Sequence, residues 1–283
     1  MPVLELRDGA GMAYAELGTG HPVLLVHGWA ANGSFFSDLA QRLSTQHRVL
    51  TPTLRGHPGS QPGSLPLTIE TLAGDLVELA DALGVKSLTA LGWSMGAMAL
   101  WAAAPRLGAR LDAMIVEDMG PRLVNDASWV EGICGGYGEA DIAATVAEIR
   151  SDWPAYVARF APRMFAPGAR DRNAQLIDWA TREMAAADGA AMAAFWQSMA
   201  SQDFRHLLAR IAAPMLVIRG QESQVYPDGA TAHIACVAPN AKRLVIPGAG
   251  HVPHLEAPDV FLSNVEAFVR AARRGELMSG GAV

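Results

Sequence analysis

The chain has 283 residues, of which 51% are hydrophobic and 18% are charged. This length suffices for one large α/β domain that carries an insertion, or at most for two domains. The 22 Lys and Arg residues against 28 Asp and Glu give a formal charge of −6, and the basic residues form no block, which argues against a nucleic-acid partner.

The amino-terminal stretch and the cysteines carry no sign of secretion. The stretch "MPVLELRDGAGMAY" has neither the charged nor the apolar region of a signal peptide. No apolar run approaches the roughly 20 residues that span a bilayer. Cys134 and Cys236 form neither a disulfide framework nor a metal-type spacing. We therefore expect a cytoplasmic protein with reduced cysteines and without a membrane partner.

The first half of the chain alternates short β-type runs with helical patterns. The runs "VLEL" (3–6) and "MAYAEL" (12–17) predict an antiparallel hairpin. Leucines recur on one face of residues 67–84, and the helix that they predict begins near Thr68 and ends before Gly84. Nearly continuous apolar runs, typical of parallel strands covered on both faces, lie at "PVLLV" (22–26), "RVLTPTL" (48–54), "SLTAL" (87–91) and "LDAMIV" (111–116).

The same alternation returns in the last third of the chain. Two further strands are predicted at "PMLVI" (214–218) and "KRLVIP" (242–247), followed by a helix near 258–273. The pattern predicts an α/β fold whose mostly parallel, eight-stranded sheet has helices on both faces. We assign residues 1–120 and 208–274 to this core, and 275–283 to a flexible tail.

Residues 121–207 show helical patterns and no strand pattern. We interpret this segment as a helical cap inserted at the carboxyl end of the sheet. Aromatic and methionine side chains crowd it, and we expect most of them to pack its own core. A minority is expected to line an apolar acyl pocket beneath the cap. The pocket candidates, two of which lie outside the cap, are Trp93, Trp129, Tyr137, Trp153, Phe160 and Val252.

Residues 92–96 read Gly-Trp-Ser-Met-Gly, which is a G-x-S-x-G pattern. The pentapeptide alone can arise by chance in a chain with 28 glycines, but here it follows a predicted strand and precedes a predicted helix. A serine on such a tight strand-to-helix turn is held above the sheet edge, and the flanking glycines remove Cβ atoms that would clash. The pattern therefore predicts Ser94 as a nucleophile.

A general base is expected late in the chain, because a serine hydroxyl is a weak nucleophile at neutral pH. The segment "PGAGHVPHLEAP" (247–258) follows the last strand, and its small residues allow a loop to bring His251 back over the sheet. His254 is the competitor, and its spacing resembles a metal-binding pair. No third ligand accompanies the two histidines, so no metal site is predicted.

An oxyanion hole requires two preorganised N–H donors. One is the backbone N–H of Met95, at the start of the helix after Ser94. The other is predicted in the loop "LLVHGWAANGS", at the N–H of Trp29. A simple turn is the alternative for His27 and Gly28, but the position directly after a buried strand favours the functional interpretation.

The segments "VHGW", "RGHPGS", "GWSMG" and "GAGHVPHLEAP", in this order and spacing, resemble the α/β-hydrolase superfamily. The resemblance covers residues 1–273, although in the helical insertion it is only architectural. "LLVHGW" with "GWSMG" is similar to carboxylesterases that cleave pimeloyl-carrier-protein methyl ester, and to small cytoplasmic esterases. The resemblance implies that Ser94 is the nucleophile, that His251 is the base, and that Trp29 and Met95 are the oxyanion donors. Thr53 departs from the family, in which an Asp is common before "LRGH".

The acid of the triad is not obvious. In this fold the loop after the strand 214–218 often carries it, yet "IRGQESQVYP" has Ser223 at that position and only Glu222 nearby. Asp118, in "MIVEDMGPR" (114–122), ends the strand after the nucleophile's helix and preserves the chain order Ser, Asp, His. Its alternative role is a helix or turn cap. We predict Asp118 as the acid, Glu222 as the runner-up, and Glu117 on the opposite side.

The leading hypothesis is a serine carboxylester hydrolase that uses no cofactor and acts on a small ester with a short to medium apolar acyl group. Lactonase, thioesterase and carbon–carbon hydrolase activities stay open on the same triad, as does a cofactor-free haloperoxidase or perhydrolase. A non-catalytic sensor of a small apolar ligand is the alternative of a different class. The Ser nucleophile argues against the dehalogenase and epoxide-hydrolase branches, which use Asp. Assembly as a homodimer also stays open.

Overall fold

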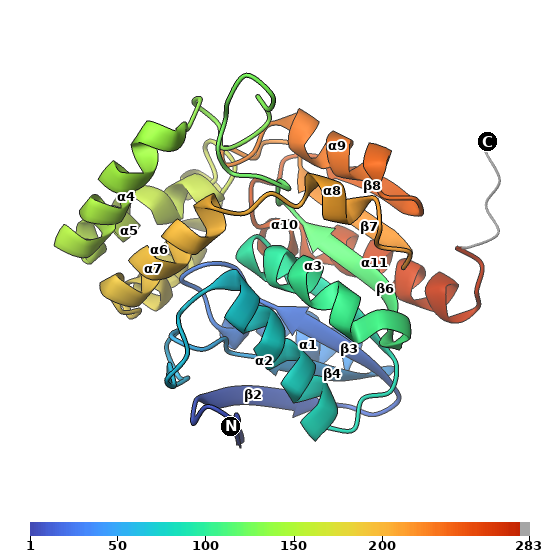
Figure 1. Ribbon diagram of the computed structural model, residues 1–283. Helices are drawn as coiled ribbons and strands as arrows, with labels where there is room; N and C mark the ends of the chain where they lie inside the picture. Colours follow the sequence, from blue (N-terminus) through green and yellow to red (C-terminus); the bar gives the residue numbers. More distant parts are fainter. Residues whose placement is uncertain (278–283) are drawn as a thin grey trace.

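A computed structural model describes residues 1–277, which contain an eight-stranded sheet in the order β1-β2-β4-β3-β5-β6-β7-β8 (Figure 1). β1 and β2 pair as an antiparallel hairpin, β2 pairs antiparallel with β4, and the remaining pairs are parallel. The prediction of a mostly parallel, eight-stranded sheet is confirmed. The strands are β1 Val3–Glu5, β2 Gly11–Leu17, β3 His21–Val26, β4 His47–Pro52, β5 Leu88–Trp93, β6 Leu111–Glu117, β7 Met215–Gly220 and β8 Ala241–Ile246.

The strand order explains how helices come to cover both faces of the sheet. The chain steps from β3 outward to β4 and then back past β3 to β5. Because crossovers between parallel strands are right-handed, this reversal places the two connecting helices on opposite faces. α2 and α3 lie side by side in front of the sheet in Figure 1. The helices of the core are α1 Ser37–Leu43, α2 Ile69–Ala82, α3 Met95–Leu107, α8 Arg205–Leu208, α9 Asp228–Val237, α10 Pro253–Glu256 and α11 Pro258–Arg273.

α2 illustrates how local sequence sets the helix boundaries. The side chain of Thr68 accepts a hydrogen bond from the backbone N–H of Thr71 at 3.1 Å, which satisfies a donor that the helix itself leaves free. Gly84 has φ of +65°, the left-handed conformation that ends many helices. Leu72 and Leu76 between them are fully buried. Both predicted boundary residues are therefore confirmed.

Of the five helices between β6 and β7 in the chain, four gather at the end of the sheet toward which the arrows of β3 and β6 point (Figure 1). Several hydrogen bonds join this group to the loops at the carboxyl ends of the strands. The indole Nε1 of Trp29 donates to the Met192 carbonyl at 2.9 Å, and the N–H of His251 donates to the Met164 carbonyl at 2.6 Å. The division into core and cap domains stays a prediction. These four helices are α4 Glu139–Ser151, α5 Trp153–Phe160, α6 Arg170–Ala185 and α7 Gly189–Ala200. A short 3₁₀ turn, Ala161–Met164, lies between α5 and α6, and two others lie earlier in the chain, at Gly33–Phe36 and Gly108–Arg110.

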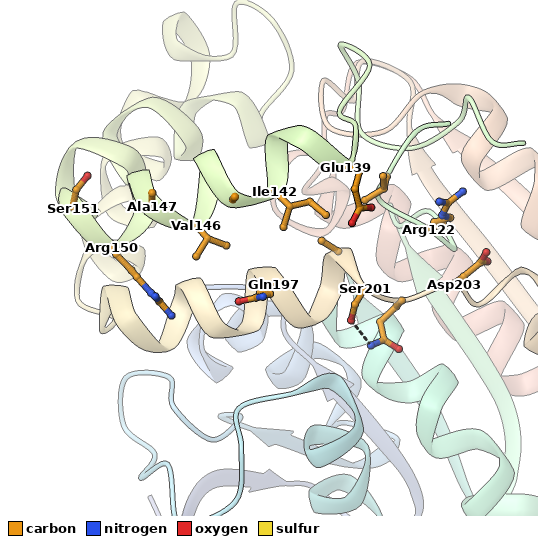
Figure 2. Close-up of a pocket in the computed structure, with 14 residues that line it drawn as sticks. Arg122, Glu139, Ile142, Val146, Ala147, Arg150, Ser151, Gln197, Ser201 and Asp203 are labelled. Atoms are coloured by element: carbon orange, nitrogen blue, oxygen red, sulfur yellow. Dashed lines mark hydrogen bonds between the residues drawn. The ribbon is translucent and has the colours of Figure 1, made fainter. Parts of the chain in front are cut away.

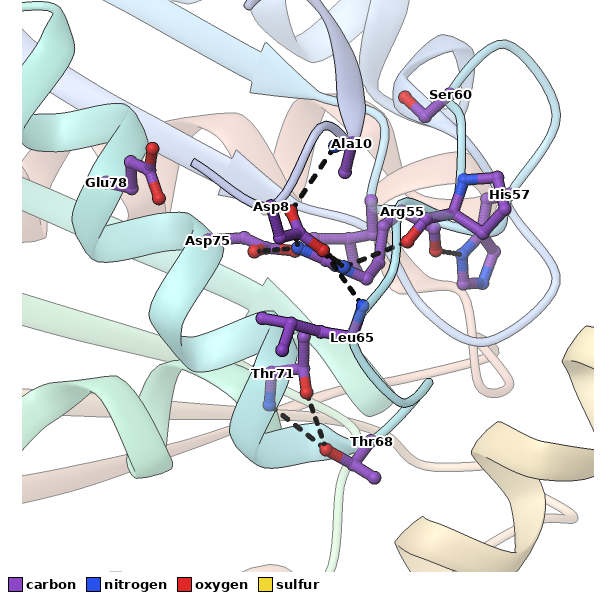
Figure 3. A network of polar contacts seen from close by, with 12 residues as sticks. Asp8, Ala10, Arg55, His57, Ser60, Leu65, Thr68, Thr71, Asp75 and Glu78 are labelled. Atoms are coloured by element: carbon purple, nitrogen blue, oxygen red, sulfur yellow. Dashed lines mark hydrogen bonds and ion pairs between the residues drawn. The ribbon is translucent and has the colours of Figure 1, made fainter. Parts of the chain in front are cut away.

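A buried arginine ties the first hairpin, α2 and the loop after β4 together (Figure 3). The guanidinium of Arg55, which is 1% exposed, donates to the Asp75 carboxylate at 2.5 and 2.6 Å and to the Asp8 carboxylate at 2.7 and 3.1 Å. The bond from Arg55 holds the pKa of Asp8 well below its usual range, whereas burial raises the pKa of Asp75. This ion pair cluster holds the "RGHPGS" loop (55–60), which contains His57.

Thr53, the residue that departs from the family pattern, has a structural contact. Its Oγ1 accepts a hydrogen bond from the N–H of Gly33 at 3.2 Å, and its own N–H donates to the Ala13 carbonyl at 2.8 Å. α11 ends at Arg273, and residues 278–283 of the predicted tail lie outside the described residues. In the described part of the chain, no helix is both long and apolar enough to cross a membrane.

Candidate active site

Ser94 lies on a sharp turn between β5, which ends at Trp93, and α3, which begins at Met95. Its backbone has φ 53° and ψ −123°, a strained conformation for a non-glycine residue that costs on the order of 1–3 kcal/mol. A Cβ on Gly92 would lie 2.5 Å from the N of Ala97, and a Cβ on Gly96 would lie 2.2 Å from the Val26 carbonyl oxygen. Only glycine fits at these two positions, so the G-x-S-x-G pattern is a packing requirement of the turn.

The turn at Ser94 is hydrogen-bonded to the neighbouring strand β6, and the amino terminus of α3 follows it directly. The N–H of Ser94 donates to the Glu117 carbonyl at 3.0 Å, across the junction of β5 and β6. Met95 is the first residue of α3, so its N–H has no acceptor within the helix. The aligned peptide dipoles of this 13-residue helix place partial positive charge at the same point. The local field therefore favours an anion beside Ser94.

His251 and Asp118 form a buried pair next to this turn. The Nδ1–H of His251 donates to Oδ2 of Asp118 at 2.6 Å, and the two residues are 2% and 0% exposed. In a neutral imidazole this contact leaves Nε2 as the nitrogen that can accept a proton. The indole Nε1 of Trp93 donates to the carbonyl of His251 at 2.9 Å, which brings the histidine loop beside the residue that precedes Ser94.

The loop after β7 supplies a hydroxyl where the acid was first sought. Oγ of Ser223 donates to the same Oδ2 of Asp118 at 2.6 Å. The sequence analysis missed this contact, although the unexpected serine at this position was its only available signal. Glu222, the runner-up acid, is exposed, and its backbone N–H donates to the Ala249 carbonyl at 2.8 Å. The structure thus brings His251 together with Asp118 rather than with Glu222.

The loop after β3 approaches Ser94 closely and is held by two neutral histidines. A Cβ on Gly28 would lie 3.1 Å from the Cβ of Ser94. Nε2 of His27 accepts a hydrogen bond from the Leu54 N–H at 2.9 Å, and Nε2 of His57 accepts one from the Ala30 N–H at 3.3 Å. Burial, reinforced by the neighbouring His57, lowers the pKa of His27 well below its usual value, and burial lowers the pKa of His57 to about 4.

The comparisons with known proteins bear directly on this arrangement. The model of the family that is described as alpha/beta hydrolase fold matches residues 21–258 of this chain. The chain belongs to this family. It is 29% identical over 261 residues to a pimeloyl-[acyl-carrier protein] methyl ester esterase of Xanthomonas campestris pv. campestris, covering 90% of this chain and 97% of that protein. The corresponding esterase of Nitrosospira multiformis is 27% identical over 263 residues, or 91% and 98% of the two chains.

Solved structures agree with the family. A thermophilic esterase from Thermogutta terrifontis superposes with a TM-score of 0.85 at 26% identity, covering 96% of this chain and 98% of that one. An enol-lactonase from Burkholderia xenovorans LB400 also has a TM-score of 0.85, at 22% identity over 95% and 100% of the chains. The second similarity supports the fold of this α/β hydrolase and not its substrate.

Aromatic side chains of α5 and α7 surround Trp29 of this α/β hydrolase. The rings of Trp153 and Phe160 meet the Trp29 indole edge-on, with centroids 5.3 and 5.6 Å away. Trp196 packs 5.1 Å from the same indole, and its Nε1 donates to the Tyr137 hydroxyl at 2.8 Å. The predicted pocket residues Trp153, Phe160 and Tyr137 therefore belong to one cluster around Trp29.

The other three pocket candidates lie elsewhere. Trp93 and Val252 are buried, at 1% and 0% exposed, and they are the chain neighbours of Ser94 and His251. Trp129 packs edge-on against His233 of α9, with ring centroids 4.9 Å apart, and its Nε1 donates to the Arg122 carbonyl. Their contact with a substrate stays a prediction.

Two of the hollows that α4 and α7 line differ in character. One of about 270 Å³ lies beside the Trp29 cluster and is lined by Ile133, Cys134, Tyr137, Thr145, Glu148, Tyr156, Arg159, Phe160, Arg163, Trp196 and Val225. A larger one of about 1100 Å³ lies between α4 and α7 (Figure 2), and neither Ser94 nor His251 lines either of the two hollows. The smaller hollow is the better candidate for a substrate group, because Val225 joins it to the loop of Ser223.

His254 does not share a site with His251. Its Nδ1–H donates to Oε1 of Glu117 at 2.7 Å, whereas His251 pairs with Asp118. The two adjacent carboxylates thus bind different histidines. Within residues 1–277, no group of three or more His, Cys, Asp or Glu side chains is arranged to hold a metal ion.

Proposed function

We propose that this α/β hydrolase is a serine carboxylesterase, which cleaves esters of small to medium apolar acyl groups through an acyl-enzyme on Ser94. The observation that carries the proposal is the buried His251–Asp118 pair, at 2.6 Å, beside a serine on a strained strand-to-helix turn. The coarser assignment, an esterase-type hydrolase, follows from the family and from the names of the curated relatives and of the Thermogutta structure.

In the first step Oγ of Ser94 attacks the ester carbonyl carbon, while Nε2 of His251 takes the hydroxyl proton. Asp118 accepts the Nδ1–H bond throughout and stabilises the imidazolium that forms. The carbonyl oxygen becomes an oxyanion, for which the N–H groups of Trp29 and Met95 are the proposed donors. Their backbone is preorganised by the strained turn and by the histidine-supported loop, so little reorganisation is required.

The second half of the cycle returns each group to its starting state. His251 gives its proton to the alcohol oxygen as the carbon–oxygen bond breaks, and the acyl group stays on Ser94. The same Nε2 then takes a proton from water, whose oxygen attacks the acyl carbon. The acid is released when the proton passes back to Oγ of Ser94. No cofactor takes part in these steps.

The aromatic cluster around Trp29 supports the proposal that the acyl group of the substrate is apolar and of limited length. Trp29 carries a proposed oxyanion donor on its backbone, while its indole is enclosed by Trp153, Phe160 and Trp196. The hollow of about 270 Å³ beside this cluster is bounded mainly by apolar and aromatic side chains. Such walls favour the burial of a short hydrocarbon chain, whereas a longer chain gains little additional burial there.

A second candidate is an ester whose acyl chain is attached to a carrier protein. The curated relatives have such a substrate in their names, and they align over nearly their whole length. Arg159 and Arg163 line the hollow beside the Trp29 cluster, and Arg163 is exposed. If this candidate is right, Arg163→Glu lowers kcat/KM for the carrier-bound methyl ester but not for the free methyl ester of the same acid.

The proposal is tested with a panel of p-nitrophenyl esters from acetate to dodecanoate. We expect turnover that is highest for short to medium chains and declines beyond about ten carbons, because the hollow has a volume of only about 270 Å³. A profile that rises steadily to dodecanoate would contradict the substrate class. Ligand binding without turnover of any ester, lactone or thioester would favour the sensor. Cytoplasmic location and assembly as a homodimer stay predictions.

A further inference from the structure

A second buried His–carboxylate pair lies beside the proposed catalytic pair. Oε1 of Glu117 accepts hydrogen bonds from Nδ1 of His254 at 2.7 Å and from the backbone N–H of the same residue at 3.0 Å. Glu117 is 0% and His254 is 4% exposed. Oε2 of Glu117 and Nε2 of His254 have no hydrogen-bond partner among residues 1–277. Burying these polar atoms costs free energy that apolar residues would not cost, so stability alone does not account for the pair.

Glu117 connects the segments that carry all three proposed catalytic residues. Its carbonyl oxygen accepts the N–H of Ser94 at 3.0 Å, and it directly precedes Asp118. Its carboxylate holds His254, three residues after His251 at the start of α10. Asp118 binds His251 and Glu117 binds His254, so the two carboxylates hold the histidine segment at two separate points.

The indole of Trp93, the residue before Ser94, contacts both histidines. Its ring centroid lies 5.3 Å from that of His254 and 5.7 Å from that of His251, and its Nε1 donates to the His251 carbonyl. Phe36 closes the far side of the His254 ring at 4.7 Å. His254 is therefore packed against the residue that precedes the nucleophile.

We propose that Glu117 and His254 are positioning residues, which set the relative placement of Ser94 and His251. The inference rests on the proposed function. Asp118 holds the histidine segment at the His251 ring, and Glu117 holds the same segment three residues later, at the ring and the backbone N–H of His254. Because a misplacement of about 1 Å can reduce a rate about 100-fold, the second pair acts on the chemical step rather than on substrate binding.

The test compares Glu117→Leu, Glu117→Gln and His254→Phe with the wild type. Each rate is divided by the amount of Ser94 that reacts with a stoichiometric phosphonate label. Unfolded protein is therefore left out of the comparison. We expect Glu117→Leu to lower kcat at least 30-fold with KM changed less than twofold. Glu117→Gln should recover most of the rate, because its amide oxygen still accepts both bonds. His254→Phe keeps the ring packing but loses the side-chain bond, and should lower kcat at least tenfold.

Leu88→Ala is the matched control, because Leu88 is buried at the amino end of β5, away from Ser94. It should lower the melting temperature without changing kcat per labelled site. If Glu117→Leu and His254→Phe behave like Leu88→Ala, with kcat within threefold of the wild type, the pair is only structural and the inference is wrong. If Glu117→Leu does not fold, His254→Phe decides alone.

The rate of phosphonate labelling separates this inference from the proposed function. Labelling requires the Ser94–His251 geometry but not a particular ester. A wild type that is labelled at Ser94 yet hydrolyses no ester would refute the substrate class, and slower labelling of the Glu117 and His254 variants would still support the inference. A wild type that is not labelled at Ser94 would refute both.

Discussion

Asp118 and Glu222 make the sharpest contrast at the scale of single residues. Asp118 is fully buried and accepts the His251 bond at 2.6 Å, whereas Glu222 is exposed. We expect Asp118→Asn to lower kcat about 10³- to 10⁴-fold, because the amide no longer selects the imidazole tautomer that the base requires. Glu222→Gln should stay within twofold of the wild type. Steady-state ester hydrolysis measures both, and the reverse ranking would show that the later loop supplies the acid.

Ser223 is predicted to support the acid rather than to replace it. Its hydroxyl is a second donor to Oδ2 of Asp118, and a hydrogen bond to a charged group contributes about 1.5–3 kcal/mol. We expect Ser223→Ala to lower kcat by roughly tenfold or more, since about 1.4 kcal/mol corresponds to a factor of ten. Ser201→Ala, which removes an exposed hydroxyl from the end of α7, is the control. Equal kcat for the two variants would exclude a role for Ser223 in orienting Asp118.

At the scale of elements, the two loops that follow β3 and β4 depend on neutral histidines. His57 has its pKa lowered by burial to about 4, so the folded state resists a proton that the unfolded chain accepts near pH 6.5. Its contribution to stability is therefore fully present above pH 6.5 and is lost as the pH falls toward 4. The loss amounts to about 3 kcal/mol.

Urea unfolding at pH 7, 5.5 and 4.5 measures this loss. Burial raises the pKa of Asp75 and of Glu256, and these carboxyls act in the opposite direction, so the comparison is made between the wild type and His57→Gln. The variant should be less stable at pH 7, because a buried contact is altered, but its unfolding free energy should fall less steeply below pH 6.5. Parallel pH profiles would mean that His57 does not titrate in this range.

The segment between α5 and α6 is anchored to the histidine loop by Glu256. One carboxylate oxygen accepts the N–H of Ala166 at 2.9 Å and the other accepts that of Gly250 at 2.6 Å. In Glu256→Gln one of these donors faces an amide NH₂ group, so we expect faster amide hydrogen exchange at 164–166 and at 250–251. Glu266→Gln, which alters a pair with Arg270 on the surface of α11, should leave exchange there unchanged. Unchanged exchange in Glu256→Gln would show that other contacts hold the segment.

At the scale of the whole molecule, the features that could be predicted from the sequence are those with local or periodic causes. Apolar runs predict the strands because a parallel sheet is buried on both faces. The turn at Ser94 follows from two glycines whose Cβ atoms would clash. Asp118 could be placed because it directly follows the strand that pairs with β5, the strand before Ser94.

The contacts that could not be predicted join side chains far apart in the chain. Ser223 is 105 residues from Asp118, and Glu117 is 137 residues from His254. No periodicity encodes such pairs, since they depend on how the loops meet at the edge of the sheet. For the same reason the aromatic composition of the cap could not show that Trp153 and Phe160 surround Trp29 while Trp129 packs on α9.

The central claim, an acyl-enzyme on Ser94, is tested most directly by mass spectrometry of phosphonate labelling together with ester turnover by Ser94→Ala. Ser94 is 7% exposed and makes no side-chain contact that caps α3, so its replacement should leave the melting temperature nearly unchanged. We predict one adduct per chain, on the peptide that contains Ser94, and turnover by the variant below about one part in a thousand. An adduct on another residue, or turnover by Ser94→Ala above that level, would contradict the account.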